Sequence, residues 1–199
     1  TSLEHQSHGA ERTMKPQLGD TILNRYTLVS SLREEPGIQA WKANDRVLAK
    51  DCQLFIITDR SAFAAIDELA GRMAATRPDR VIPVLKYRME SDVLLIVMPV
   101  DSGQCLTDYM VDTAKPLSYS AIRSIIGECA NVLREVIADT PSGIVITTDT
   151  VRVTTSGVQI ADAPCATMLA DTSATDLRTD GPERYAIRQL AALLYTLLT

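Results

Sequence analysis

Three short segments in which apolar and polar residues alternate follow one another closely near the start of the chain. They span about 25–32, 38–44 and 52–58, and both the alternation and the lengths are typical of β-strands. Pro36-Gly37 separates the first two segments and is a pair that favours a tight turn, so we expect a hairpin there. The chain is therefore expected to begin with an antiparallel sheet.

The remaining chain adds helices of different kinds to this sheet. A stripe of apolar residues at helical spacing predicts a helix at 61–75, and the strongest stripe predicts a long helix at 118–138. The other expected elements are a buried strand at 93–98, three short β-type runs at 143–146, 151–154 and 158–161, a polar stretch at 163–180 and an apolar helix at 185–199.

Composition excludes several classes of function. The chain has 199 residues, of which 46% are hydrophobic and 23% charged, as in ordinary soluble globular proteins. A net charge of −5 argues against nucleic acid as a partner, because phosphate binding needs concentrated Lys and Arg. No apolar run reaches the roughly 18 residues that a membrane-spanning helix needs.

Cysteine and histidine usage predicts neither a metal site nor a disulfide framework. The cysteines are widely spaced and have no histidine nearby. Both histidines, His5 and His8, lie in a polar leader at 1–19, so the folded part has no imidazole for catalysis. A reducing, cytoplasmic location is expected. The four cysteines are Cys52, Cys105, Cys129 and Cys165.

The order of elements and several residues resemble bacterial serine/threonine protein kinases. Arg25-Tyr26 matches the start of their first strand, and Leu32 and Asp45 are spaced as in those kinases. The resemblance implies a bilobed α+β fold with a leader at 1–19. A five-stranded antiparallel small lobe would occupy 20–98, and a mainly helical large lobe, truncated after its central helix, would occupy 99–199.

The resemblance also shows that residues used for phosphate binding are replaced. A kinase needs small loop residues over the phosphates and a lysine that pairs with them and with a helix glutamate. Glu68 is the best match for that glutamate, with Asp67 as the alternative, and without the lysine we interpret it as a solvated residue. The three loop glycines become Arg33, Glu35 and Ile38, and the lysine becomes Phe55.

The expected catalytic and metal-binding loops are similarly reduced. The segment before 151–154 has no His-Arg pair and no asparagine, and Asp149 is its only acid. We interpret Asp149 as a turn residue. Asp162 matches the magnesium-binding aspartate, but the glycine two residues later is Pro164. We therefore expect no catalytic residue, no bound metal and no cofactor: the chain resembles a pseudokinase rather than an enzyme.

A closer resemblance concerns the segment from Pro36 to Trp41. Pro-Gly-Ile-Gln-Ala-Trp is similar to the loop of the pseudokinase domain attached to actinobacterial MviN (MurJ), which flips a peptidoglycan precursor. This implies a cytoplasmic domain, tethered to a membrane domain outside this chain, that an active bacterial serine/threonine kinase phosphorylates and a forkhead-associated domain protein then binds. Candidate phosphoacceptors are Thr167, Thr172, Thr175 and Thr179, although the acceptor could lie elsewhere and these could be plain loop threonines.

Two other functions remain open from the sequence. The first is a divergent kinase that still binds ATP and transfers phosphate slowly. The second is a pseudokinase that docks directly onto an active kinase through its small lobe and needs no phosphothreonine.

Overall fold

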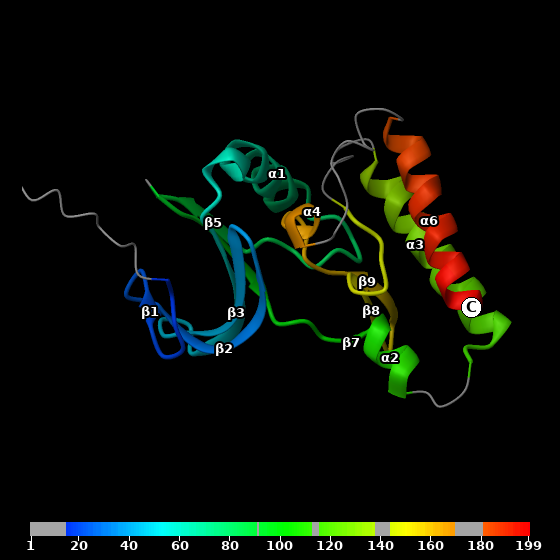
Figure 1. Cartoon of the computed structure of the whole chain (residues 1–199), viewed down its shortest axis with the longest axis horizontal. Coiled ribbons are helices and arrows are strands. Elements are labelled where there is room, and N and C mark those ends of the chain that lie inside the picture. Colours follow the sequence, from blue (N-terminus) through cyan, green and yellow to red (C-terminus); the bar gives the residue numbers. More distant parts are fainter. Residues whose placement is uncertain (1–14, 91, 113–115, 138–143, 170–180) are drawn as a thin grey trace, which may run out of the picture.

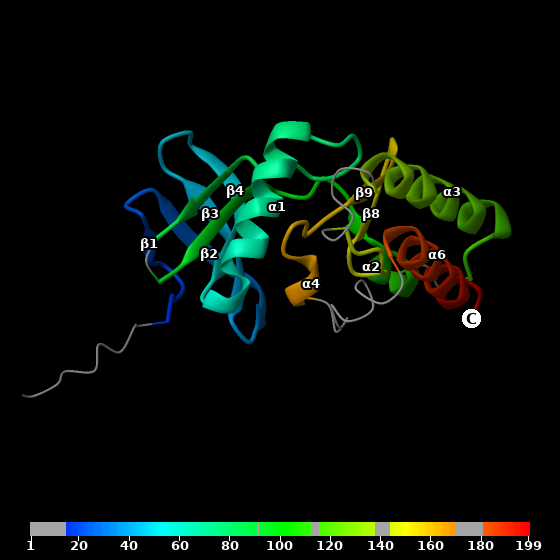
Figure 2. The same cartoon turned by 90° about the horizontal axis from the view of Figure 1, so that it is seen from above.

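The structure is a computed structural model. It describes residues 15–90, 92–112, 116–137, 144–169 and 181–199. The described chain forms two adjoining parts: a curled sheet with one helix, and a mainly helical part that contains a smaller sheet (Figures 1 and 2). The two parts are joined by the segment that leads from the larger sheet to the smaller one.

The larger sheet is antiparallel and has six strands in the order β1-β2-β3-β4-β6-β5. The five strands predicted for this lobe were therefore one too few. The strands to which the sequence assigned no range are β1, with two residues, and β5, with four, and both are too short to produce a recognisable alternation. The strands are β1 Thr21–Ile22, β2 Tyr26–Glu35, β3 Ile38–Asp45, β4 Lys50–Ile57, β5 Lys86–Met89 and β6 Leu94–Pro99.

Alternation along the central strands gives each face of this sheet its own apolar cluster. Phe55 and Ile57 of β4 belong to a large core cluster, whereas Leu54 and Ile56 belong to a second, smaller cluster. Helix α1 (Phe63–Thr76) contributes its apolar stripe, including Ile66, to the large cluster. It therefore covers one face of the sheet, as Figure 1 shows, and within the described part of the chain no helix lies on the other face.

The second part combines a three-stranded sheet with four described helices. Its longest helices, α3 and α6, lie side by side and bury their facing apolar stripes (Figures 1 and 2). Ser118 caps the start of α3 by accepting a hydrogen bond from the N–H of Ala121 at 3.1 Å. The elements are β7 Gln104–Cys105, β8 Val151–Thr154, β9 Gly157–Ile160, α2 Leu106–Asp112, α3 Tyr119–Val136, α4 Ala166–Leu169 and α6 Pro182–Leu198.

The two parts share one hydrophobic core. The segment after α1 crosses to β9, where the N–H of Ile82 donates to the carbonyl of Ile160 and the N–H of Ile160 donates to the carbonyl of Arg80. These hydrogen bonds measure 2.9 and 2.8 Å. The large cluster continues through this crossing, from Phe55 in the sheet to Leu193 in α6. The parts are thus packed against each other and not merely linked.

One predicted strand is absent, and the structure shows why. Residues 144–146 are buried but form no strand; Gly143 lies outside the described residues. The side chain of Gln189 in α6 accepts a hydrogen bond from the N–H of Ile146 at 2.5 Å and donates to the carbonyl of Ile144 at 3.4 Å. A glutamine side chain therefore supplies the hydrogen bonds that a neighbouring strand would provide. Within the described ranges, no helix is long and apolar enough to cross a membrane.

Candidate functional site

A cavity of about 370 Å³ lies between the larger sheet and the second part. Its walls come from β2, β3 and β4 on one side and from the segment after β6, β8 and the region of α4 on the other. It carries charges of both signs. The lining residues are Leu32, Arg33, Ala40, Lys42, Gln53, Val100, Asp101, Asp108, Arg152, Asp162 and Leu169.

Asp101 is the centre of a polar network on one side of this cavity. One of its carboxylate oxygens accepts a hydrogen bond from Arg152 Nε at 2.7 Å, and the other accepts one from Gln53 Nε2 at 2.6 Å. Gln53 also donates to the carbonyl of Pro99 at 3.3 Å. Because the charged groups of Arg152 and Asp101 are largely buried, this pair fixes the segment after β6 against both β4 and β8. Sequence reasoning missed this network, since its members are far apart in the chain.

Asp162 follows β9 and also lines the cavity, where it is buried. Burial raises the pKa of its carboxyl group, while the positive charges of Arg152 and Arg33 act in the opposite direction. Among the described residues there is no cluster of three or more acidic, histidine or cysteine side chains able to hold a metal ion.

Phe55 is located in the middle of β4, where its side chain is 1% exposed. It pairs in register with Ala40 of β3 on one side and with Ile96 of β6 on the other. All three residues belong to the large core cluster, as does Ile38. The position that resembles the kinase lysine is therefore surrounded by apolar side chains.

The two charged residues expected in the phosphate loop lie at the end of β2. The guanidinium of Arg33 donates to the backbone carbonyl of Leu169, at the end of α4, and lies 3.9 Å from the carboxylate of Glu35. This contact joins residues 136 positions apart in the sequence. It brings the β2–β3 hairpin onto the second part, a role that the sequence did not indicate.

Glu68 and Asp149 are both exposed and bond to neighbours on the surface. Glu68 is exposed on α1 and accepts a hydrogen bond from Arg72, one helical turn later, at 2.6 Å. Asp149 is exposed in a turn, and its carboxylate accepts a hydrogen bond from the hydroxyl of Thr107 at 2.8 Å. The alternative to Glu68, Asp67, is half-buried on the same helix.

The candidate phosphoacceptors divide into two groups. Thr167 lies in the short helix α4 and is half-buried. Thr172, Thr175 and Thr179 lie outside the described residues. The structure therefore describes the surroundings of Thr167 alone among the four candidates.

Comparison with known proteins supports the architecture. No protein-family model matches the chain, and no curated protein matches it in sequence. Among solved structures, the crystal structure of Rad53 1–466 in complex with AMP-PNP matches with a TM-score of 0.69 at 17% sequence identity. The match covers 87% of this chain and 48% of the Rad53 chain.

This chain has a kinase-like fold. The neighbour, Rad53, is a protein kinase, and the similarity at this identity concerns the fold alone. The chain spans about half the length of the Rad53 chain that it matches. The kinase-like fold confirms the expected combination of an antiparallel sheet with a mainly helical part.

Proposed function

We propose that this chain is a catalytically inactive kinase-like domain that acts as a phosphorylation-dependent docking platform. The observation that carries the inactive part is the burial of Phe55 among apolar side chains at the lysine position. A phenyl ring cannot pair with phosphates, and the residues that pair with Phe55 in register, Ala40 and Ile96, are apolar.

The charges that do line the cavity support the same proposal. Lys42 is paired with Asp51 at 3.6 Å, and the guanidinium of Arg33 is bonded to the carbonyl of Leu169. Arg152, the third cation that lines the cavity, is paired with Asp101, so all three have partners within the chain. Phosphotransfer depends almost entirely on positioned cations and metal ions around the phosphates, and here the groups available for that task are engaged elsewhere.

The acidic residues also favour an inactive domain. The loop at 144–150 contains no asparagine that could share a magnesium ion with Asp162, so one of the two ligands that a kinase uses is missing. Asp149 accepts a hydrogen bond from Thr107 at the surface of a turn, so one of its oxygens is already occupied by a structural contact.

The docking part of the proposal rests on the resemblance to the pseudokinase domain of actinobacterial MviN. In this proposal an active bacterial serine/threonine kinase phosphorylates a threonine, and a forkhead-associated domain protein binds it to regulate peptidoglycan synthesis at the cytoplasmic side of a membrane. Such recognition needs an accessible phosphate that arginine side chains can surround. Thr167 is half-buried, so Thr172, Thr175 and Thr179 are the preferred acceptors.

The test is calorimetry with a forkhead-associated domain protein before and after treatment with an active bacterial serine/threonine kinase. Binding is expected only after treatment and should disappear when a phosphatase removes the phosphate. Thr172→Ala, Thr175→Ala and Thr179→Ala are compared singly, with Thr167→Ala as the matched control that keeps binding. Equal affinity before and after treatment would contradict phospho-docking.

A second measurement separates direct docking from phospho-docking. The kinase is incubated with the domain without ATP, and complex formation is followed by analytical ultracentrifugation. A stable complex under these conditions, together with no phosphorylation-dependent binding, would favour the pseudokinase that docks directly onto an active kinase.

A further inference from the structure

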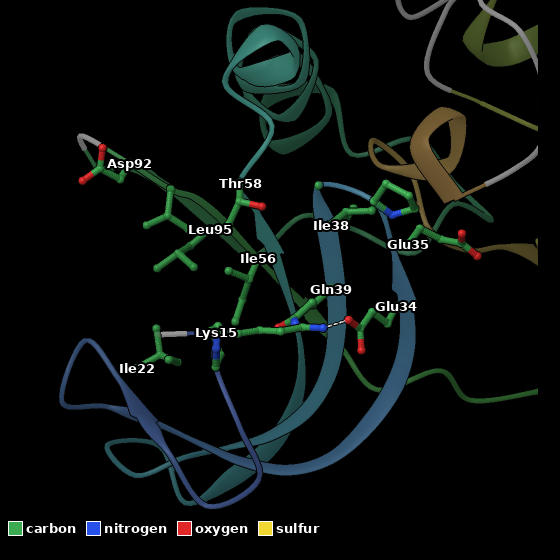
Figure 3. A pocket seen from close by; sticks show the side chains of 14 residues that line it. Lys15, Ile22, Glu34, Glu35, Ile38, Gln39, Ile56, Thr58, Asp92 and Leu95 are labelled. Carbon is green, nitrogen blue, oxygen red and sulfur yellow. Dashed lines mark ion pairs between the residues drawn. The ribbon is translucent and has the colours of Figure 1, made fainter. Parts of the chain in front are cut away.

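A second cavity lies on the face of the larger sheet that α1 does not cover. It has a volume of about 940 Å³. Figure 3 shows Ile56 and Leu95 at its base and Ile22 at its edge. Ile56 and Leu95 belong to the smaller core cluster, whose members come from the sheet alone. The cavity is therefore an apolar hollow formed by the curl of the sheet and separate from the cavity around Asp162.

Acidic side chains surround this hollow. Glu34, Glu35 and Asp92 line it, whereas Lys15 is the only cation among its lining residues. Asp92 is paired with Arg60, and Glu35 lies 3.9 Å from Arg33. Each of the three acids therefore has a cationic partner, and only the partner of Glu34, Lys15, itself lines the cavity. A cation from a bound segment would thus match the charge of the cavity at Glu34, in the place of Lys15.

The chain itself shows how a cation fits this cavity. In Figure 3 the side chain of Lys15 extends across the opening toward Glu34, with which it forms an ion pair. The side chains of Lys15 and Glu34 are 61% and 52% exposed, so water screens this pair and it contributes little. The aliphatic stem of a lysine can lie along apolar surface while its ammonium group reaches a carboxylate. Lys15 is thus a weakly held occupant that another cation can replace.

Gln39 adds a polar group to the cavity. Its side-chain oxygen accepts a hydrogen bond from Trp41 Nε1 at 3.0 Å. Within the described residues the amide nitrogen of Gln39 donates no hydrogen bond. It can therefore donate one to a backbone carbonyl of a bound segment. Trp41 is the only tryptophan of the protein and is connected to the cavity through this bond.

We propose that this hollow binds a segment of another protein in which a lysine or arginine lies beside an aliphatic residue. The aliphatic residue contacts Ile56 and Leu95, the cation replaces Lys15 at Glu34, and Gln39 bonds the backbone of the segment. This interaction requires neither phosphorylation nor the cavity around Asp162, so it is independent of the proposed docking through phosphothreonine.

The test uses a peptide with acetylated and amidated ends, Leu-Lys-Leu-Lys, and its neutral counterpart Leu-Gln-Leu-Gln. Each is titrated into the full chain while the fluorescence of Trp41 is measured. The lysine peptide should give a saturable change, and the glutamine peptide should bind less tightly. In Lys15→Ala the lysine peptide should bind about two- to fivefold more tightly, because the competing cation is gone.

The contribution of Glu34 is measured in the Lys15→Ala background. Glu34→Gln alone would remove both the partner of the peptide and the partner of its competitor, so the two effects would offset each other. In the double variant, affinity should fall about two- to fivefold relative to Lys15→Ala. Glu183→Gln, an exposed substitution on α6 with the same change of charge, is added to Lys15→Ala as the matched control and should leave affinity unchanged.

Two results would overturn the proposal. One is the absence of a saturable fluorescence change in both the wild type and Lys15→Ala, with circular dichroism showing that both are folded, as expected if the hollow is permanently filled. The other is equal affinity of the lysine and glutamine peptides in all variants, which would mean that the acidic rim has no part in binding.

Discussion

Phe55 and Asp162 show how burial acts on an apolar and on an ionisable side chain. Phe55 places an apolar ring at a position that is 1% exposed, and Asp162 places a carboxyl group where water has little access. Substitution of either residue should change the free energy of unfolding, because burial stabilises an apolar ring and destabilises a charged carboxylate.

Substitution of Phe55 by lysine should destabilise the fold without restoring nucleotide binding. An ammonium group at this position would be buried among apolar residues, with Glu68 exposed and paired with Arg72. The loss should be at least as large as that for truncation of a buried phenylalanine, about 3–5 kcal/mol. Urea unfolding measures it, with Val29→Lys at an exposed position of β2 as control, expected within about 0.5 kcal/mol of wild type. Wild-type stability in Phe55→Lys would contradict this account of the core.

Asp162 should make stability depend on pH in an unusual direction for an aspartate. Because its folded-state pKa is raised, the folded state holds the proton more tightly than the unfolded state. Stability should therefore fall as pH rises from the unfolded value of about 3.9 through the raised folded-state pKa. Asp162→Asn has no carboxyl group to ionise, so its free energy of unfolding should exceed that of the wild type at neutral pH. The difference between the two should shrink in acid.

The measurement is urea unfolding of both proteins across this pH range. Glu183→Gln serves as a control at an exposed position and should follow the wild-type profile. An advantage of Asp162→Asn that is the same at every pH would show that the substitution acts through packing and not through ionisation.

At the scale of elements, the β2–β3 hairpin depends on the backbone conformation of Gly37. Its φ of +79° lies in the left-handed region, and a Cβ atom added there would lie 2.7 Å from Cβ of Asp59. The carbonyl of Gly37 also accepts a hydrogen bond from the N–H of Thr58 at 2.8 Å, so the turn is held against the end of β4. The hairpin carries Arg33 and Glu35 and thereby positions one side of each cavity.

Gly37→Ala should therefore destabilise the protein by more than about 1 kcal/mol. Gly127 provides the matched control, since it lies in α3 and a Cβ atom there would meet nothing within 4 Å. Gly127→Ala should stabilise the protein by about 0.5–1 kcal/mol, because alanine has the higher helix propensity. Thermal and urea unfolding give both values, and a stabilising Gly37→Ala would disprove the strained conformation of the turn.

The sequence predicted those elements whose periodicity is long enough to read. The stripes of α1 and α3 and the alternation in β2, β3 and β4 appear in the structure close to their expected positions. The two-residue strands β1 and β7 and the short helices α2 and α4 have no such signal, because they contain too few residues for a period. The loss of the strand at 144–146 depends on Gln189, which is more than 40 residues away.

The candidate sites were predictable to a smaller extent. The replacement of a lysine by Phe55 was readable from the resemblance to kinases, and its burial follows from the apolar strand around it. The Arg152–Asp101–Gln53 network and the contact of Arg33 with Leu169 were not, since both depend on how the two parts come together. Long-range side-chain contacts leave no spacing pattern in a sequence.

At the scale of the whole molecule, a bound nucleotide would stabilise the entire fold, because the cavity is formed by both parts. A ligand present at one hundred times its dissociation constant raises the free energy of unfolding by about 2.7 kcal/mol. With the lysine position filled by Phe55, millimolar ATP with magnesium should leave the melting temperature unchanged. The measurement is a thermal shift assay with an active kinase as positive control, and a clear rise would favour the weakly active ATP-binding kinase.

The crossing between the two parts has a consequence for how the chain could be divided. A cut at Val100 would leave the six-stranded sheet and α1 in one fragment, with Val81, Ile82 and Val84 uncovered where they are now buried. The other fragment would keep β9 but lose the backbone partners of Ile160. Each fragment would expose to water the apolar residues that it now buries against the other, so it would be poorly folded alone. The two pieces are therefore suited to fragment complementation, in which a reporter divided between them becomes active only when they reassemble.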